Sequence, residues 1–152
     1  MMARFQTQAP TGTLVQELEG WVRAAIFEPA NALVGYLLQA AVDQIDATYQ
    51  PQPGQAFKER VRVQIQGLFG HFELQRDYYY HAGKQQGHYP ADAALGLEGG
   101  YTPALARLLC LEGADETSYQ KAELHLAETG GIAVSARQIQ RVVQQVGQAA
   151  QA

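Results

Sequence analysis

Cysteine, tryptophan, methionine and charge are all scarce in this sequence. Its 152 residues include one cysteine, one tryptophan and two methionines, and only 17% of them are charged. The single cysteine, Cys110, excludes an internal disulfide and any zinc site built from several cysteines. No uninterrupted apolar run approaches the roughly 18 residues of a membrane span, and the N-terminus lacks the features of a signal peptide. We therefore expect a cytoplasmic protein with no membrane partner.

The sequence signatures of catalysis and of metal binding are also missing. There is no Gly-rich phosphate loop, no nucleophile elbow and no cysteine beside a plausible base. Asp43 and Asp46 lie three residues apart on an expected helix, which is typical of a solvated face. His71, His81 and His88 match no known ligand spacing. We predict that the chain is not an enzyme and holds no cofactor or metal ion.

Acidic residues outnumber basic ones, but the excess is uneven along the chain. Fifteen Asp and Glu against eleven Lys and Arg give a net charge of −4, which weighs against tight binding to nucleic acid. Residues 56–90 hold five basic and three acidic side chains, and residues 117–152 hold three and two. Residues 1–55 and 91–116 carry the acidic excess. Contact with DNA is therefore allowed only in the two mildly basic segments.

Apolar residues recur at helical spacing through the first 50 residues. Thr13 and Gln16 form a capping box that begins one helix, and Pro29 ends it and begins another that runs to about Tyr49. Two amphipathic helices with a tight connection predict an antiparallel helical hairpin over residues 1–52. Its apolar stripes pack either on the rest of the chain or on a second copy, and the pattern leaves both interpretations open.

The middle of the chain has the pattern of a β-hairpin. A linker at Pro51–Gly54 precedes residues 61–66, where apolar and polar side chains alternate, and a Gly-bounded turn leads to a second strand at residues 72–80. A loop then runs to Pro90. The tyrosines at 78–80 are either rings packed on the faces of a strand or a platform for nucleic-acid bases.

Three helical patterns follow in residues 101–152. They begin near Thr102, at Thr117 and at Ser135, which forms a capping box with Gln138, and Gly130-Gly131 supply a turn before the last. This order is typical of a helix-turn-helix domain. The predicted fold class is therefore α+β and mainly α. The expected regions are a helical hairpin (1–52), a β-hairpin with a loop (53–100) and a helix-turn-helix-like domain (101–152).

The last helix is the best candidate for a binding surface. Ile139, Val142, Val143 and Val146 form an apolar stripe, and the opposite face carries Arg and Gln. In a helix-turn-helix domain this helix enters the major groove, where Arg pairs with guanine and Gln with adenine, while the preceding helix holds phosphates. The alternative is a bundle helix with a hydrated polar face. The predicted DNA contacts are Ser135, Arg137, Gln138, Gln140, Arg141 and Gln144, with Ser118, Tyr119 and Lys121 on the preceding helix.

Residues 67–147 contain an ordered set of motifs that resembles a known family. The set is Gly70, Arg76, Tyr79-Tyr80, the block Pro90-Ala-Asp92-Ala-Ala-Leu95-Gly96-Leu97, Tyr101-Thr-Pro103, Leu105, Ser118, Ala122, Leu126, Gly130-Gly131, Val134-Ser135, Gln138 and Arg141. It resembles the N-terminal region of bacterial insertion-sequence transposases of the ISKra group, which share features with the Mutator-like transposases. The first 55 residues resemble that region only loosely.

The resemblance implies a DNA-binding and assembly region that precedes an RNase H-like catalytic domain with an Asp-Asp-Glu metal site, and these 152 residues contain no such domain. Many relatives carry Cys-x-x-Cys after the tyrosines, where this chain has His81 and Lys84. We expect a non-catalytic module of a truncated or split transposase that binds double-stranded DNA at element ends. Self-association or association with full-length transposase is expected as well. The alternative is an oligomerisation or regulatory protein that inhibits a full-length transposase.

Overall fold

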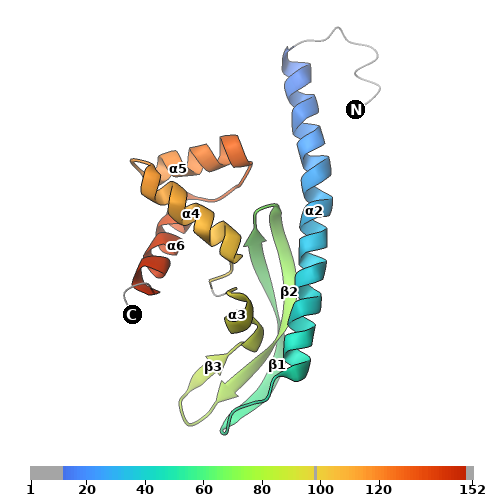
Figure 1. Ribbon diagram of the computed structural model, residues 1–152, viewed down its shortest axis with the longest axis vertical. Helices are drawn as coiled ribbons and strands as arrows, with labels where there is room; N and C mark the ends of the chain where they lie inside the picture. The colour runs from blue at the N-terminus through green and yellow to red at the C-terminus, as the bar shows by residue number, and fades with distance from the viewer. Residues whose placement is uncertain (1–11, 98, 150–152) are drawn as a thin grey trace.

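The computed structural model describes residues 12–97 and 99–149 of the chain (Figure 1). It is mainly helical with one small antiparallel sheet, so the predicted α+β class is confirmed. In chain order the elements are α2 (Gly12–Thr48), β1 (Gln55–Gly67), β2 (Gly70–His81), β3 (Gln86–His88), α3 (Pro90–Leu95), α4 (Pro103–Asp115), α5 (Tyr119–His125), the π-helical turn η1 (Leu126–Gly130) and α6 (Ala136–Ala149).

The predicted N-terminal helical hairpin is wrong, because residues 12–48 form one continuous helix with Pro29 inside it. A proline removes one backbone hydrogen bond, but its fixed φ is compatible with a helix. Pro29 and Ala25, four residues before it, are both exposed, so water can satisfy the carbonyl that loses its partner. The C-terminal half of α2 lies along β2 (Figure 1).

Length and apolar composition alone would also allow α2 to cross a membrane. These two properties do not distinguish a membrane span from a helix that packs on a protein core. In the structure, Val42 of α2 is 1% exposed and belongs to a core shared with the sheet. Val34, Leu38 and Val42 on this side of the helix therefore have partners within the chain, whereas Leu33, Tyr36 and Leu37 are more than half exposed.

The central β-hairpin is confirmed, with strands longer than the alternating pattern indicated. β1 and β2 pair antiparallel from Gly67↔Gly70 at the turn to Gln55↔His81 at the far end. β3 and α3 lie in segments for which no element was predicted. β3 has only three residues, so its strand conformation depends on pairing with β2 rather than on a sequence pattern of its own.

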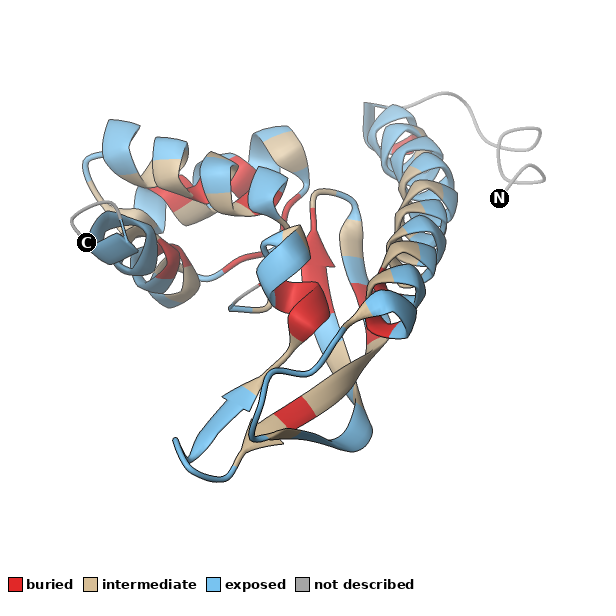
Figure 2. Cartoon of the chain, turned by 60° about the horizontal axis from the view of Figure 1, so that its bottom comes forward, coloured by how far each residue is buried: buried red, intermediate tan, exposed pale blue. Residues whose placement is uncertain are grey.

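Two separate hydrophobic clusters divide the described chain into two units. In the first unit α2, the sheet and α3 share a core, and in the second unit α4, α5 and α6 share another (Figure 2). The buried residues of the first core are Val42, Ile65, Phe72, Leu74, Ala91 and Leu97. Those of the second are Tyr101, Leu105, Leu109, Ala122, Leu126, Ile132, Val134, Ile139 and Val142.

Charged groups are buried in the first unit. The Arg76 guanidinium of β2 pairs with the Asp92 carboxylate of α3 and lies over the Tyr89 ring, 4.0 Å from its centroid. Burial lowers the pKa of Arg76. Asp46 was predicted on a solvated face, but it is 8% exposed, and its Oδ2 accepts a hydrogen bond from the Asp77 amide at 2.9 Å. That prediction is wrong because β2 covers this side of α2.

Gln66 of β1 joins the two units. Its amide donates to the carbonyl of Gly100 and its carbonyl accepts from the Thr102 amide, each at 2.9 Å. Its side-chain Nε2 donates to the Ala133 carbonyl at 2.8 Å, just before α6. Arg23 of α2 adds a bond of 3.0 Å to the Thr129 carbonyl. These bonds fix the second unit against the sheet.

The three C-terminal helices are confirmed, with one shift. Thr102 caps α4 as predicted, since its Oγ1 accepts from the Leu105 amide at 3.4 Å. α5 begins one residue later than expected from Thr117, because Ser118 is the residue that caps it. The helix ends through η1 at Gly131, whose φ of 63° favours glycine.

Candidate nucleic-acid interface

The first turn of α6 is held by a capping box. The Ser135 amide donates to Gln138 Oε1 at 2.8 Å, and the Gln138 amide donates to Ser135 Oγ at 3.3 Å. Glu123 of α5 contributes a third bond, in which its Oε2 accepts from the Ala136 amide at 2.8 Å. Ser135 and Gln138 were predicted to contact DNA, but in the structure their side chains bond to each other. A carboxylate also occupies the end of the helix that otherwise attracts phosphate.

α6 has one buried face and one exposed face. Ile139 is 0% and Val142 3% exposed, so they fix the helix in the second core, whereas Val146 of the same predicted stripe is 47% exposed. The opposite face carries exposed polar side chains, and α6 contains no acidic residue. The residues of this face, which we call the polar face of α6, are Arg137, Gln140, Arg141 and Gln144.

The predicted α6 residues come together in one place. They border an open hollow of about 440 Å³, which Ser135 and Gln138 line at one end and Gln144 at the other. Arg141 Nη2 donates to the Tyr101 hydroxyl at 2.8 Å, which holds this guanidinium near the helix surface. Arg137 forms no ion pair with a residue of the described ranges. Its charge is therefore available to an outside partner.

The three residues predicted on α5 do not border this hollow. Ser118 Oγ accepts from the Lys121 amide at 3.3 Å, so it caps α5. Tyr119 packs against the second core. Of the three, only Lys121 is exposed, and its ammonium group forms no ion pair with a residue of the described ranges. Lys121 therefore stays a candidate phosphate contact, whereas Ser118 and Tyr119 support the fold.

The tyrosine run packs within the first unit. Tyr79 is 6% exposed and meets Tyr49 edge-on at 4.9 Å between ring centroids. Tyr78 stacks at a tilt on Tyr89, also at 4.9 Å. Burial raises the pKa of the Tyr79 hydroxyl. This geometry favours the interpretation of the run as packed strand residues over that of a platform for bases.

One group of side chains in the described ranges has the composition of a metal site. Glu112 of α4, Glu116 directly after it and His125 of α5 place one ligand atom each within 4.8 Å of the others. His125 Nδ1 lies 2.6 Å from Glu112 Oε2 and 3.8 Å from Glu116 Oε1. A hydrogen bond between histidine and glutamate accounts for this geometry by itself. No sequence pattern indicates the group, because His125 reaches the two glutamates only when α5 packs beside α4.

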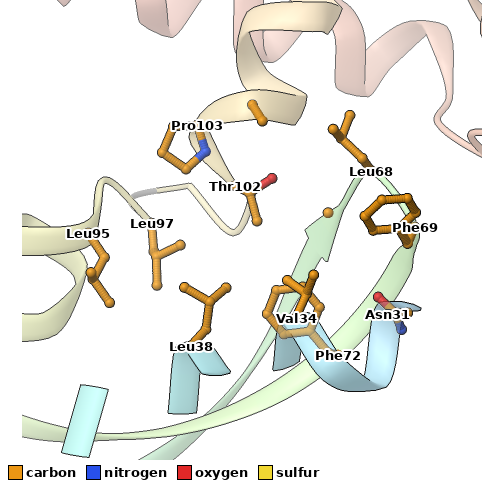
Figure 3. Close-up of a pocket in the computed structure, with 12 residues that line it drawn as sticks. Asn31, Val34, Leu38, Leu68, Phe69, Phe72, Leu95, Leu97, Thr102 and Pro103 are labelled. Atoms are coloured by element: carbon orange, nitrogen blue, oxygen red, sulfur yellow. The ribbon is translucent and has the colours of Figure 1, made fainter. Parts of the chain in front are cut away.

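An apolar cavity of about 410 Å³ lies where the two units meet (Figure 3). Val34 and Leu38 of α2 line it together with Phe72, Leu97 and Pro103. Asn31 lies at its edge, and its buried Oδ1 has no hydrogen-bond partner within the described chain. None of the residues that line the cavity borders the polar face of α6. The cavity has the lining to accept an apolar group, but it is separate from the candidate interface.

Many motif residues in the resemblance to the ISKra group have structural roles. Asp92 forms the buried ion pair, Gly96 ends α3 with a φ of 65°, and Leu105 is 0% exposed in the second core. These motifs therefore describe how the chain folds and do not by themselves assign an activity. Comparison of the sequence with protein-family models and with curated proteins finds no match, so the functional argument depends on the geometry of α6.

Proposed function

We propose that this protein is a cytoplasmic, non-catalytic DNA-binding and assembly module, a truncated or split transposase that recognises the ends of its element. The observation that carries the proposal is the polar face of α6. Two arginines and two glutamines project from one helix that has no acidic residue, and Ile139 and Val142 anchor the opposite side in a core. A rigid helix with this face has the chemistry of a recognition helix.

The side chains match base edges in the major groove, which is wide enough for one helix. Arg137 and Arg141 can each pair bidentately with the O6 and N7 of guanine. Gln140 and Gln144 can pair with the N6 and N7 of adenine. Lys121 at the start of α5 is suited to a phosphate, which would position the module without contributing to sequence choice.

Charge limits the affinity that this interface can reach. The chain has a net charge of −4, and Glu123 lies at the N-terminus of α6. The interface would neutralise few phosphates, so the affinity for DNA should be modest. It should decrease only slightly as the salt concentration is raised. Sequence preference should then come mainly from the arginines and glutamines.

Binding to a duplex that carries the terminal repeats of the proposed element, measured by fluorescence anisotropy at low salt, tests the proposal. The variant Arg137→Ala/Arg141→Ala should lose at least about tenfold in affinity, since one bidentate arginine contributes about 1–3 kcal/mol. Arg107→Ala, which removes an exposed arginine of α4, is the matched control and should bind like the wild type. A shuffled duplex measures the sequence-independent part.

Equal affinity of the double variant and the wild type for the terminal repeats, at low salt, would end the proposal. Thermal unfolding of each variant is needed alongside, because Arg141 also bonds to Tyr101. The single variant Arg137→Ala avoids that complication, since Arg137 makes no ion pair in the described chain.

A further inference from the structure

α2 exposes a second apolar face, on the side away from the sheet. Val34, Leu38 and Val42 lie on its inner side in the first core. Its other side is largely exposed in Figure 2, and large apolar residues recur along it. This outer face of α2 consists of a stripe formed by Val15, Val22, Ile26, Leu33 and Leu37, with Tyr36 and Trp21 beside it, and the seven side chains are 41–74% exposed.

The outer face is large enough for a stable interface. Its seven exposed side chains present on the order of 700 Å² of apolar surface, against about 800 Å² per partner in a stable protein complex. Exposed apolar patches of this size on a folded chain mark sites of association. A membrane surface is a poor match, because Glu17, Glu19 and Glu28 of the same helix would be repelled by anionic lipid.

The order of residues on the outer face is symmetric. Val22, Ile26, Leu33 and Leu37 are separated by four, seven and four residues, so the pattern is the same in both directions along the helix. A two-fold interface requires that residue i of one copy contact residue j of the other while j contacts i. An antiparallel helix pair meets this requirement when Val22 lies opposite Leu37 and Ile26 opposite Leu33.

We infer that the outer face of α2 is a homodimer interface, in which α2 of a second copy lies antiparallel along it with the two-fold axis between Pro29 and Ala30. That axis is also at the middle of α2, so the helices overlap along nearly their whole length from Gly12. The spacings of four and seven add to an eleven-residue repeat, which is close to the period of a straight helix. Two straight helices can keep this contact without strong supercoiling.

The antiparallel register also suits the charges. It places Glu19 opposite Ala40 and Glu28 opposite Asn31 of the second copy, so no acidic residue faces another. A parallel pair would place each glutamate beside its own copy, at a cost from like-charge repulsion. Antiparallel packing in addition aligns the helix dipoles favourably.

Dimerisation through α2 does not require DNA binding, but it would determine how two DNA half-sites are arranged. A two-fold dimer presents two α6 helices related by the same axis, and such a dimer binds half-sites arranged as an inverted repeat. If the Arg137→Ala/Arg141→Ala variant still dimerises but does not bind DNA, the two conclusions are separated.

Disulfide cross-linking of the full-length chain tests the register in a Cys110→Ser background. Ile26→Cys and Leu33→Cys are prepared as separate proteins, each at an exposed position. In the antiparallel register neither protein should cross-link with itself, because its two cysteines would be about seven residues, or roughly 10 Å, apart along the helices. A mixture of the two should form a covalent dimer. Leu111→Cys, another exposed leucine at 53%, is the control that should not cross-link with either.

Sedimentation equilibrium supplies the second measurement. The wild type should dimerise, and Ile26→Lys should raise the dimer dissociation constant at least about tenfold, whereas the control Leu111→Lys should not. A wild type that remains monomeric at about 100 μM, on the order of the dissociation constants of the weakest biological dimers, would overturn the inference. Self-linking of Ile26→Cys alone would overturn it in favour of a parallel pair, and binding of monomers to phosphatidylcholine–phosphatidylglycerol vesicles would overturn it in favour of lipid.

Discussion

Helix α6 of the second unit and helix α2 of the first expose different kinds of surface to solvent. In the second unit α6 buries Ile139 and Val142 and turns a polar face outward. In the first unit α2 buries Val42 and turns Ile26 and Leu33 outward, each more than half exposed. A helix with a polar outer face needs only its own core, whereas a helix that is apolar on both sides requires a second partner. The difference is the reason for proposing DNA at the polar face of α6 and a second copy of the chain at α2.

The cores of the two units differ as well. The apolar cluster of the first unit has buried charged groups beside it, namely the ion pair of Arg76 and Asp92 and the carboxyl of Asp46. The cluster at the centre of the second is made of apolar residues and Tyr101. Stability should therefore depend on charge in the first unit and on packing volume in the second.

The largest expected effect is that of Arg76→Ala, which leaves Asp92 buried without its partner. The side chains of the pair are 11% and 10% exposed, so removal of one should lower the free energy of unfolding by about 3–5 kcal/mol. Urea denaturation at neutral pH measures it. The double variant Arg76→Met/Asp92→Leu should lose clearly less, since it removes both charges. Equal losses for the single and double variants would contradict the role of charge in this core.

Packing in the second unit is tested by Ile139→Ala. The side chain is 0% exposed, so the cavity that remains should lower the free energy of unfolding by about 2–5 kcal/mol. The neighbouring variant Gln140→Ala lies on the polar face and should change stability by no more than about 0.5 kcal/mol. If the two variants unfold at the same denaturant concentration, α6 is not anchored as described.

A smaller effect is expected at the cap of α6. Ser135→Ala removes the oxygen that accepts from the Gln138 amide and should lower the free energy of unfolding by about 1 kcal/mol. Ser135→Asp keeps an acceptor there and serves as the control, with stability close to that of the wild type. A loss with Asp as large as that with Ala would show that the capping bond is not what stabilises this turn.

The smallest effect concerns pH and Asp46. Burial raises the pKa of Asp46 above the ordinary carboxyl value of 3.8, so the folded chain favours the protonated form. The contribution of this group to stability is complete below 3.8 and is lost as pH rises through the higher folded pKa. Asp46→Asn should therefore gain stability relative to the wild type as pH rises through that range. Denaturation at several acidic and neutral pH values checks this, and parallel profiles of the two proteins would contradict it.

Local signals explain what could be predicted from the sequence. Alternation over residues 61–66 and 72–80 marked both long strands, because side chains of a half-buried strand point to opposite faces in turn. The capping box of Ser135 and Gln138 was visible because its partners are three residues apart. The neighbours on the polar face of α6 follow from helical periodicity in the same way.

Features that depend on distant residues do not follow from local patterns in the sequence. Pro29 predicts the end of a helix, but solvent on one side of α2 allows the helix to continue through it. The residues around Asp46 predict a solvated face, because nothing in the local sequence shows that β2 covers this carboxyl. The group of Glu112, Glu116 and His125 has no sequence signature, since His125 lies on a different helix from Glu112.

Sequence alone determined the fold class, the β-hairpin, the three C-terminal helices and the polar face of α6, because each is set by the order of side chains within a few turns or strands. Only the tertiary structure decided which face of α2 is covered and which stays exposed. It also decided that Arg76 meets Asp92, that Arg141 meets the Tyr101 hydroxyl, and that Glu123 reaches the start of α6. Periodicity shows that a helix face is apolar, but burial depends on surfaces brought together from far apart in the chain.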